Sequence, residues 1–211
     1  MEKLSFVLPK GRLFDQTINI LTRSGVIESL VNRDSRKLIL ETKEFRFMIV
    51  RPKDVPVYVE SGIADFGVAG NDVLDEGEYD IYRPIDLGIG YCRIVVAGKP
   101  ESREIYNSNI STLKVATKYP RIATRFFMDR GIKPIIYELY GSVELAPLVG
   151  LADFIVDIVE TGTTLRENGL VVIDQIKEST AKLIVNRVSY KVKSDSVFPI
   201  IQRLESFGGG S

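Results

Sequence analysis

The segment with the clearest capacity for chemistry is FIVDIVETGTTLRENGL, residues 154–170, an apolar run that carries Asp157 and then meets a loop of hydroxyls. The loop residues are Thr161, Gly162, Thr163 and Thr164. The spacing of Thr164 and Glu167 predicts a capping box, with Thr164 as the N-cap of a helix. A buried strand that ends in such a loop directs several backbone N–H donors at one anion, and the helix dipole favours phosphate there. The acidic residues before the loop could accept hydrogen bonds from sugar hydroxyls. The segment thus fits a site for a phosphorylated ribose, or alternatively an ordinary strand-turn-helix corner.

Two further turns carry candidate ligands. Lys10, Gly11 and Arg12 follow the first predicted strand. Gly11 allows close backbone approach, and Arg12 can hold phosphate oxygens through two hydrogen bonds, which Lys10 cannot. Both cations could equally be solvated charges near a helix start. At the other turn Ser142 is a natural N-cap, and Glu144 could face a ribose or a cation as well as the helix dipole.

The chain has no histidine and one cysteine, Cys92. Nucleophile pairs that need histidine, histidine-containing metal sites and disulfides within the chain are therefore excluded. Cys92 lies in an apolar run, YCRIVVAG, which predicts a buried strand residue in preference to a reactive thiol. Catalysis must depend on carboxylates, Arg, Lys, hydroxyls, backbone amides or a hydrated cation.

Composition bounds the class of protein. The 211 residues can form one large domain or two small ones, and 45% of them are hydrophobic. Lys plus Arg and Asp plus Glu both total 28, so no net field favours nucleic acid or an anionic membrane as a partner. The N-terminal apolar run is too short for a signal peptide, and no segment has the length of a membrane span. We expect a cytoplasmic protein.

Strands alternate with helices along the sequence. Predicted strands occupy residues 4–8, 66–69, 113–117, 134–138 and 154–159, with a hairpin at 37–50. Predicted helices follow at residues 12, 54 and 71, and at 120–130, 143–148 and 195–204. This order predicts an α/β protein with mostly parallel strands. Ligands of open α/β sheets bind at the carboxyl ends of strands, here residues 10–12, 117–119 and 160–164.

Breaker-rich passages at residues 87–91 and 175–181 suggest two crossings between domains. We expect a discontinuous domain I of residues 1–90 and 180–207, and a domain II of residues 91–179. A single continuous sheet would also fit the pattern. Residues 208–211, GGGS, are expected to be a disordered tail.

Several motifs together resemble one family. They are LPKGRL (8–13), DVPVYVESGIADFGVAGNDVL (54–74), DLGIGYCR (86–93), KVATKYP (114–120) and LYGSVELAPLVGLADFIVDIVETGTTL (139–165). In this order they are similar to the ATP phosphoribosyltransferases, and the length resembles the short form of the catalytic subunit. The resemblance implies two α/β domains like those of type II periplasmic binding proteins, with the active site in the interdomain cleft. The family's long form usually has a small residue at the position of Glu160, so Asp157 is the more secure ribose ligand.

The resemblance also implies a reaction. N1 of the ATP adenine attacks C1 of phosphoribosyl pyrophosphate and releases pyrophosphate, the first step of histidine biosynthesis. Arg12 and Arg36 would act on the leaving group, and Mg²⁺ would bind mainly through the pyrophosphate, with no residue of the chain assigned as a metal ligand. A homodimer, and a regulatory subunit resembling histidyl-tRNA synthetase, are the implied partners. The rivals are a binding module of the same architecture and a phosphoribosyltransferase that acts on another base.

Overall fold

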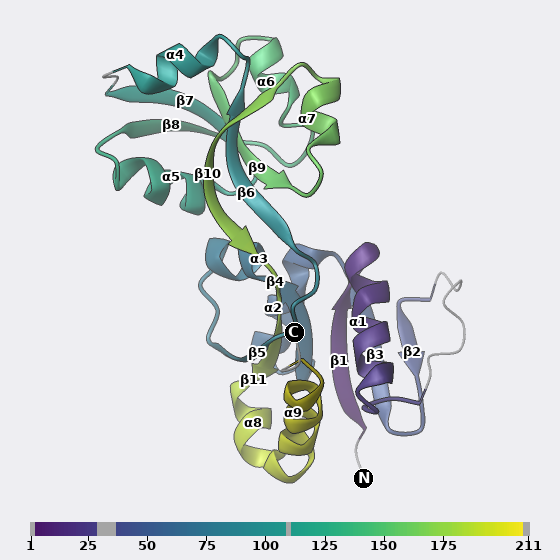
Figure 1. The fold of residues 1–211 in the computed structure, drawn as a ribbon. Helices are drawn as coiled ribbons and strands as arrows, with labels where there is room; N and C mark the ends of the chain where they lie inside the picture. Colours follow the sequence, from purple (N-terminus) through teal and green to yellow (C-terminus); the bar gives the residue numbers. More distant parts are fainter. Residues whose placement is uncertain (1–2, 29–36, 109–110, 209–211) are drawn as a thin grey trace. The chain divides into compact units, whose positions relative to one another are not determined.

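The structure is a computed structural model, and it describes residues 3–28, 37–108 and 111–208. Arg36 therefore lies outside the described residues. The chain divides into two compact units (Figure 1). Unit 1 comprises Met1–Tyr91 and Thr180–Ser211, and unit 2 comprises Cys92–Ser179. Within the described residues, each unit has its own sheet, of six strands in unit 1 and five in unit 2.

The sheet of unit 1 has the strand order β2-β3-β1-β4-β11-β5. Its strands are β1 (Leu4–Pro9), β2 (Ile39–Glu41), β3 (Phe45–Val50), β4 (Phe66–Gly70), β5 (Ile81–Asp86) and β11 (Ala181–Asn186). Because side chains alternate along a strand, the sheet has an apolar core on each face: Phe6 and Leu8 lie in one cluster and Val7 in the other. Phe6 stacks on Phe66 of the neighbouring strand with ring centroids 4.7 Å apart.

Helices cover both faces of this sheet. They are α1 (Arg12–Arg23), α2 (Val55–Glu60), α3 (Asn71–Glu76), α8 (Arg187–Val192) and α9 (Ser194–Gly208), with a 3₁₀ turn at Pro52–Asp54. Helix α1 buries Ile18 and Leu21 against the same cluster that receives Val197 of α9. Helix α2 packs on the opposite face through Val55 and Val59.

The sheet of unit 2 has the order β10-β6-β9-β7-β8. Its strands are β6 (Cys92–Gly98), β7 (Thr112–Thr117), β8 (Lys133–Glu138), β9 (Phe154–Val159) and β10 (Val171–Ser179). Its helices are α4 (Ser102–Asn107), α5 (Pro120–Met128), α6 (Leu145–Leu148) and α7 (Thr163–Glu167). Phe154 and Val156 face one apolar cluster and Ile155 the other, so β9 is buried on both sides. Cys92 is buried, as expected from its apolar run.

The prediction of mostly parallel strands is wrong. Of the nine strand pairs formed by the described residues, five are antiparallel. Strands β6 and β10 pair antiparallel at the point where the chain enters and leaves unit 2, with Cys92 opposite Ser179. Strand β11 likewise returns antiparallel to β4 and β5. The strands at the crossings between the units, β6, β10 and β11, thus add antiparallel pairs to two sheets that also contain parallel pairs.

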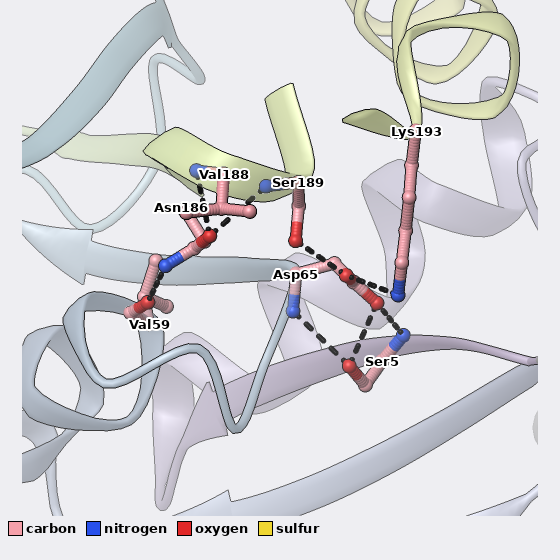
Figure 2. Close-up of polar contacts among 7 residues, drawn as sticks. All are labelled: Ser5, Val59, Asp65, Asn186, Val188, Ser189 and Lys193. Atoms are coloured by element: carbon pink, nitrogen blue, oxygen red, sulfur yellow. Dashed lines mark hydrogen bonds and ion pairs between the residues drawn. The ribbon is translucent and has the colours of Figure 1, made fainter. Parts of the chain in front are cut away.

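A buried carboxylate stabilises unit 1 at the amino ends of its parallel strands. Asp65 precedes β4 and is 3% exposed. Its Oδ1 accepts hydrogen bonds from Ser189 Oγ (2.6 Å) and Lys193 Nζ (2.9 Å), and its Oδ2 from the Ser5 backbone N–H and hydroxyl (2.9 and 2.8 Å) (Figure 2). Asn186 caps α8 beside it by accepting from the amides of Val188 and Ser189. The cluster joins β1 and β4 to α8.

Candidate active site

The candidate site in unit 2 begins where two parallel strands lie side by side. Thr117 on β7 is in register with Val156 on β9, so the next residues, Lys118 and Asp157, are neighbours. Lys118 Nζ lies 3.4 Å from Asp157 Oδ2. Thr117 fixes the turn after β7, because its hydroxyl donates to the Val156 carbonyl and accepts from the Tyr119 amide.

Asp157 is a buried acid and only 7% exposed. It shares a face of β9 with Ile155 and Val159, on the side that α6 and α7 cover. Its Oδ1 accepts a hydrogen bond from the Ile158 amide at 2.9 Å. Burial raises the pKa of Asp157 above its ordinary value, while the Lys118 ammonium opposes that rise and Glu144 adds to it. Further hydrogen bonds donated to this carboxylate would therefore stabilise its charged form.

The hydroxyl loop follows β9 directly, but its helix does not begin as the capping box predicted. Gly162, in the left-handed conformation (φ 75°), is the N-cap of α7, and Thr164 lies within the helix. Because glycine adopts this conformation without strain, the chain turns two residues earlier than predicted. The Thr161 and Thr163 hydroxyls are 3.1 Å apart. Arg166 stabilises the loop by donating to the Thr161 carbonyl (3.0 Å) and the Thr163 hydroxyl (3.1 Å).

Glu144 lies on the same side of unit 2 as Asp157. It is partly buried and immediately precedes α6, where it takes the N-cap position. The N-cap role predicted for Ser142 is therefore wrong. Ser142 instead has a positive φ of 48°, and this turn delays the start of the helix to Leu145. Glu144 and Asp157 are close enough for the charge of Glu144 to raise the pKa of Asp157.

In unit 1, the predicted basic turn follows the carboxyl end of β1. Gly11 is the N-cap of α1 with φ 88° and ψ −156°, a conformation that only glycine adopts readily. A Cβ at Gly11 would meet no atom within 4 Å, so the backbone there is open to close approach by a ligand. Lys10 and Arg12 are exposed on either side, and the Lys10 amide donates to the Val50 carbonyl at 2.8 Å. The structure thus brings Lys10, Gly11 and Arg12 together in one turn.

Sequence reasoning missed two residues of the unit 2 site. Lys118 was noted only as part of a strand end, because its proximity to Asp157 depends on the register of β7 and β9. Arg166 was not singled out, although a basic residue within one turn of a hydroxyl loop is a local signal that could have indicated it. Both residues are cations beside groups that were predicted to bind sugar or phosphate.

The described residues contain no group of three or more cysteine, aspartate or glutamate side chains placed to hold a metal ion. No helix within the described part of the chain is long and apolar enough to cross a membrane.

The fold and its strand-end loops define a two-unit α/β protein with a candidate site for a phosphorylated sugar. A family model for ATP phosphoribosyltransferase matches residues 51–206. The chain belongs to the ATP phosphoribosyltransferase family.

Individual relatives agree with this assignment over nearly the whole chain. The ATP phosphoribosyltransferase of Aquifex aeolicus (strain VF5) is 54% identical over 201 residues, which cover 95% of this chain and 93% of that protein. That of Caldanaerobacter subterraneus subsp. tengcongensis is 49% identical and is matched over 100% of both chains. The ATP phosphoribosyl transferase (HisG:HisZ) complex from Thermotoga maritima contains a chain with a TM-score of 0.81 and 37% identity, covering 99% of this chain and 100% of that one. These likenesses confirm the predicted family and fold class.

Proposed function

We propose that this chain transfers a phosphoribosyl group from phosphoribosyl pyrophosphate to ATP, in the first step of histidine biosynthesis. The bond between C1 of the ribose and the pyrophosphate oxygen breaks, and a bond forms between C1 and N1 of the adenine. The products are N1-(5-phosphoribosyl)-ATP and pyrophosphate. Membership of the family over the whole matched region is the observation that carries this proposal.

The absence of histidine from the sequence fits this reaction. N1 of adenine carries a lone pair near neutral pH, so no general base is needed to activate it. The barrier lies in separating a highly charged leaving group from a sugar that becomes cationic at C1. Catalysis then depends on positioning and on electrostatic stabilisation of the leaving group.

The unit 2 site would hold the phosphoribosyl group. The hydroxyls and amides of Thr161, Gly162, Thr163 and Thr164 would bind the 5-phosphate. Asp157 and Glu144 would accept hydrogen bonds from ribose hydroxyls. Support comes from the placement of Asp157 and the loop at the carboxyl end of β9, from the proximity of Glu144 to Asp157, and from the hydrogen bonds by which Arg166 stabilises the exposed loop. Helix α7 has only five residues, so direct hydrogen bonds matter more here than the helix dipole.

The basic turn of unit 1 would act on the pyrophosphate. The Arg12 guanidinium can hold two oxygens of the leaving group, and Lys10 adds a second positive charge. Gly11 allows the phosphate to approach the backbone. Arg36 would also act on the leaving group, as the family resemblance implies. Mg²⁺ bound mainly through the pyrophosphate would supply further neutralisation of the leaving group.

The proposed partners are a second catalytic subunit and a regulatory subunit resembling histidyl-tRNA synthetase. The similar Thermotoga maritima chain was solved as a HisG:HisZ complex, which supports a hetero-oligomer. We expect the chain to co-purify with such a subunit and to turn over faster in its presence. Turnover and sedimentation that do not change on adding the regulatory subunit would contradict this assembly.

The reaction is tested by incubating the purified chain with ATP, phosphoribosyl pyrophosphate and Mg²⁺, and by detecting N1-(5-phosphoribosyl)-ATP by mass spectrometry. Replacing ATP with another nucleotide tests the choice of base, and omitting phosphoribosyl pyrophosphate controls for background. Binding of both substrates without product would favour a binding module. Product formed only with another base would indicate a different phosphoribosyltransferase.

A further inference from the structure

Lys118 occupies an unusual position in unit 2. It follows β7 and precedes α5, and Thr117 fixes its backbone through hydrogen bonds to β9 and to Tyr119. Its side chain is 29% exposed, whereas that of Asp157 is 11% exposed. The ammonium therefore sits at the boundary between solvent and a buried acid, with its backbone held to the strand that carries that acid.

The charges around Asp157 show how Lys118 affects the protonation of this acid. The strand neighbour of Asp157 on β6 is Val95, which is apolar. Among the described residues, the charged groups that act on Asp157 include Lys118, after β7, and Glu144, ahead of α6. Burial and Glu144 both favour the protonated acid, and the Lys118 ammonium opposes them. A protonated Asp157 would donate one hydrogen bond and lose acceptor capacity that sugar hydroxyls require.

We propose that Lys118 is a positioning residue that keeps the Asp157 carboxylate ionised and oriented to accept hydrogen bonds from the ribose of phosphoribosyl pyrophosphate. This inference rests on the proposed function of the site. It assigns Lys118 an action through Asp157, and it distinguishes Lys118 from Arg12 and Lys10, whose proposed role is direct contact with phosphate.

The two kinds of role give different pH dependences. A cation that only grips phosphate weakens binding by a similar factor at every pH when it is removed. A cation that keeps Asp157 ionised shifts the pKa of Asp157 upward when it is removed, so the loss of binding is largest at low pH. Raising the pH ionises Asp157 again and restores much of the affinity.

The test compares the full chain with Lys118→Met, Lys118→Arg and the control Lys114→Met. Lys114 is an exposed residue of β7, the strand that Lys118 follows, so its replacement removes the same charge a short distance along the chain. First, the carboxyl carbon of Asp157 is titrated by NMR without ligand. We expect a higher pKa in Lys118→Met than in the parent, and values near the parent in Lys118→Arg and Lys114→Met.

Second, binding of phosphoribosyl pyrophosphate is measured by calorimetry as a function of pH. We expect Lys118→Met to bind up to about tenfold more weakly at low pH, corresponding to about one pKa unit at Asp157, and to recover as the pH rises. Lys118→Arg should retain most of the affinity. An unchanged pKa of Asp157 in Lys118→Met, or a loss of binding that is constant with pH, would overturn the inference.

Failure of the proposed function gives a different result. If Asp157→Asn binds phosphoribosyl pyrophosphate as tightly as the parent, Asp157 is not a ribose ligand, whatever the NMR titration shows. If Asp157→Asn binds weakly but Lys118→Met leaves the pKa of Asp157 unchanged, only the role of Lys118 fails.

Discussion

Asp65 and Asp157 are both buried carboxylates paired with a lysine, yet their surroundings differ in a way that separates stability from function. Asp65 receives four hydrogen bonds of 2.6–2.9 Å from Ser5, Ser189 and Lys193. Burial alone would raise its pKa, but these donors outweigh burial and hold the pKa below its ordinary value. Asp157 has the Ile158 amide and Lys118 at 3.4 Å, and its pKa is raised. One acid is satisfied by the fold, and the other retains capacity for a ligand.

The same contrast runs along β1. Near its amino end, Ser5 donates to Asp65 and joins the strand to the rest of unit 1. Beyond its carboxyl end, the chain continues into the exposed turn that contains Lys10, Gly11 and Arg12. The polar cluster at the amino end is therefore buried, whereas the residues at the carboxyl end are exposed, and ligands of α/β sheets bind at the carboxyl ends of strands.

The largest expected effect is on folding. Asp65→Asn should lower the free energy of unfolding by about 3 kcal/mol, because it leaves Lys193 and two hydroxyls without the carboxylate they share. Urea unfolding measures this loss. Asp86→Asn is the matched control: Asp86 also accepts from a lysine, a hydroxyl and an amide, but its side chain is 46% exposed, so we expect less than about 1 kcal/mol. Equal losses in both variants would refute the contrast between a buried and an exposed cluster.

The pH dependence of the parent sharpens this prediction. Because the folded pKa of Asp65 is lowered, its stabilisation is fully present above the unfolded pKa of about 3.9 and disappears as the pH falls through the folded value. In Asp65→Asn, the free energy of unfolding should therefore decrease less than in the parent as the pH is lowered. Unfolding curves recorded between about pH 2 and pH 6 provide the measurement.

Much of unit 2 was predictable because β9 and its loop form one continuous segment. The apolar run 154–159 matches β9, and the loop of hydroxyls follows it as expected. The first residue of α7 was not predictable, because Gly162 adopts a left-handed conformation and takes the N-cap position that the capping pattern assigned to Thr164. The Asp65 cluster and the Lys118–Asp157 pair could not be derived from local patterns. Ser189 is 124 positions from Asp65 and Lys118 is 39 from Asp157, so sheet register and topology bring them together.

The second prediction concerns the exposed carboxyl end of β1. Arg12→Ala should lower kcat by about 100-fold with a smaller change in ATP binding, because the contact to pyrophosphate strengthens as the leaving group gains charge. Arg12→Lys should restore only part of the rate, since an ammonium lacks the bidentate geometry. Steady-state kinetics and ATP calorimetry separate the two effects. Arg23→Ala, at the other end of α1, should leave kcat unchanged. Full activity in Arg12→Ala would remove this turn from the site.

The third prediction tests Asp157 directly. Asp157→Asn should weaken binding of phosphoribosyl pyrophosphate by about 2 kcal/mol, the size of a hydrogen bond to a charged group. Its free energy of unfolding should stay the same or rise, because a raised folded pKa means that the ionised acid opposes folding above its unfolded pKa. This is the reverse of the result expected for Asp65→Asn. A large loss of stability without a change in binding would show that Asp157 has a structural role like that of Asp65, and would contradict the contrast between the two residues.

The smallest expected effect belongs to the hydroxyl loop. Thr164→Val and Thr161→Val keep the size of the side chain and remove one hydroxyl each from the group proposed to hold the 5-phosphate. Because backbone amides and the remaining hydroxyls still bind the phosphate, each variant should lose about 1.5 kcal/mol of binding to phosphoribosyl pyrophosphate by calorimetry. Thr161→Val also removes the contact with Thr163 and should lose slightly more.

Thr112→Val, on the exposed start of β7, controls for the loss of a surface hydroxyl. Both loop residues are exposed, so stability should change little. Parent-like affinity in both variants would show that the 5-phosphate lies elsewhere, and would leave Asp157 as a ligand without its adjoining phosphate loop.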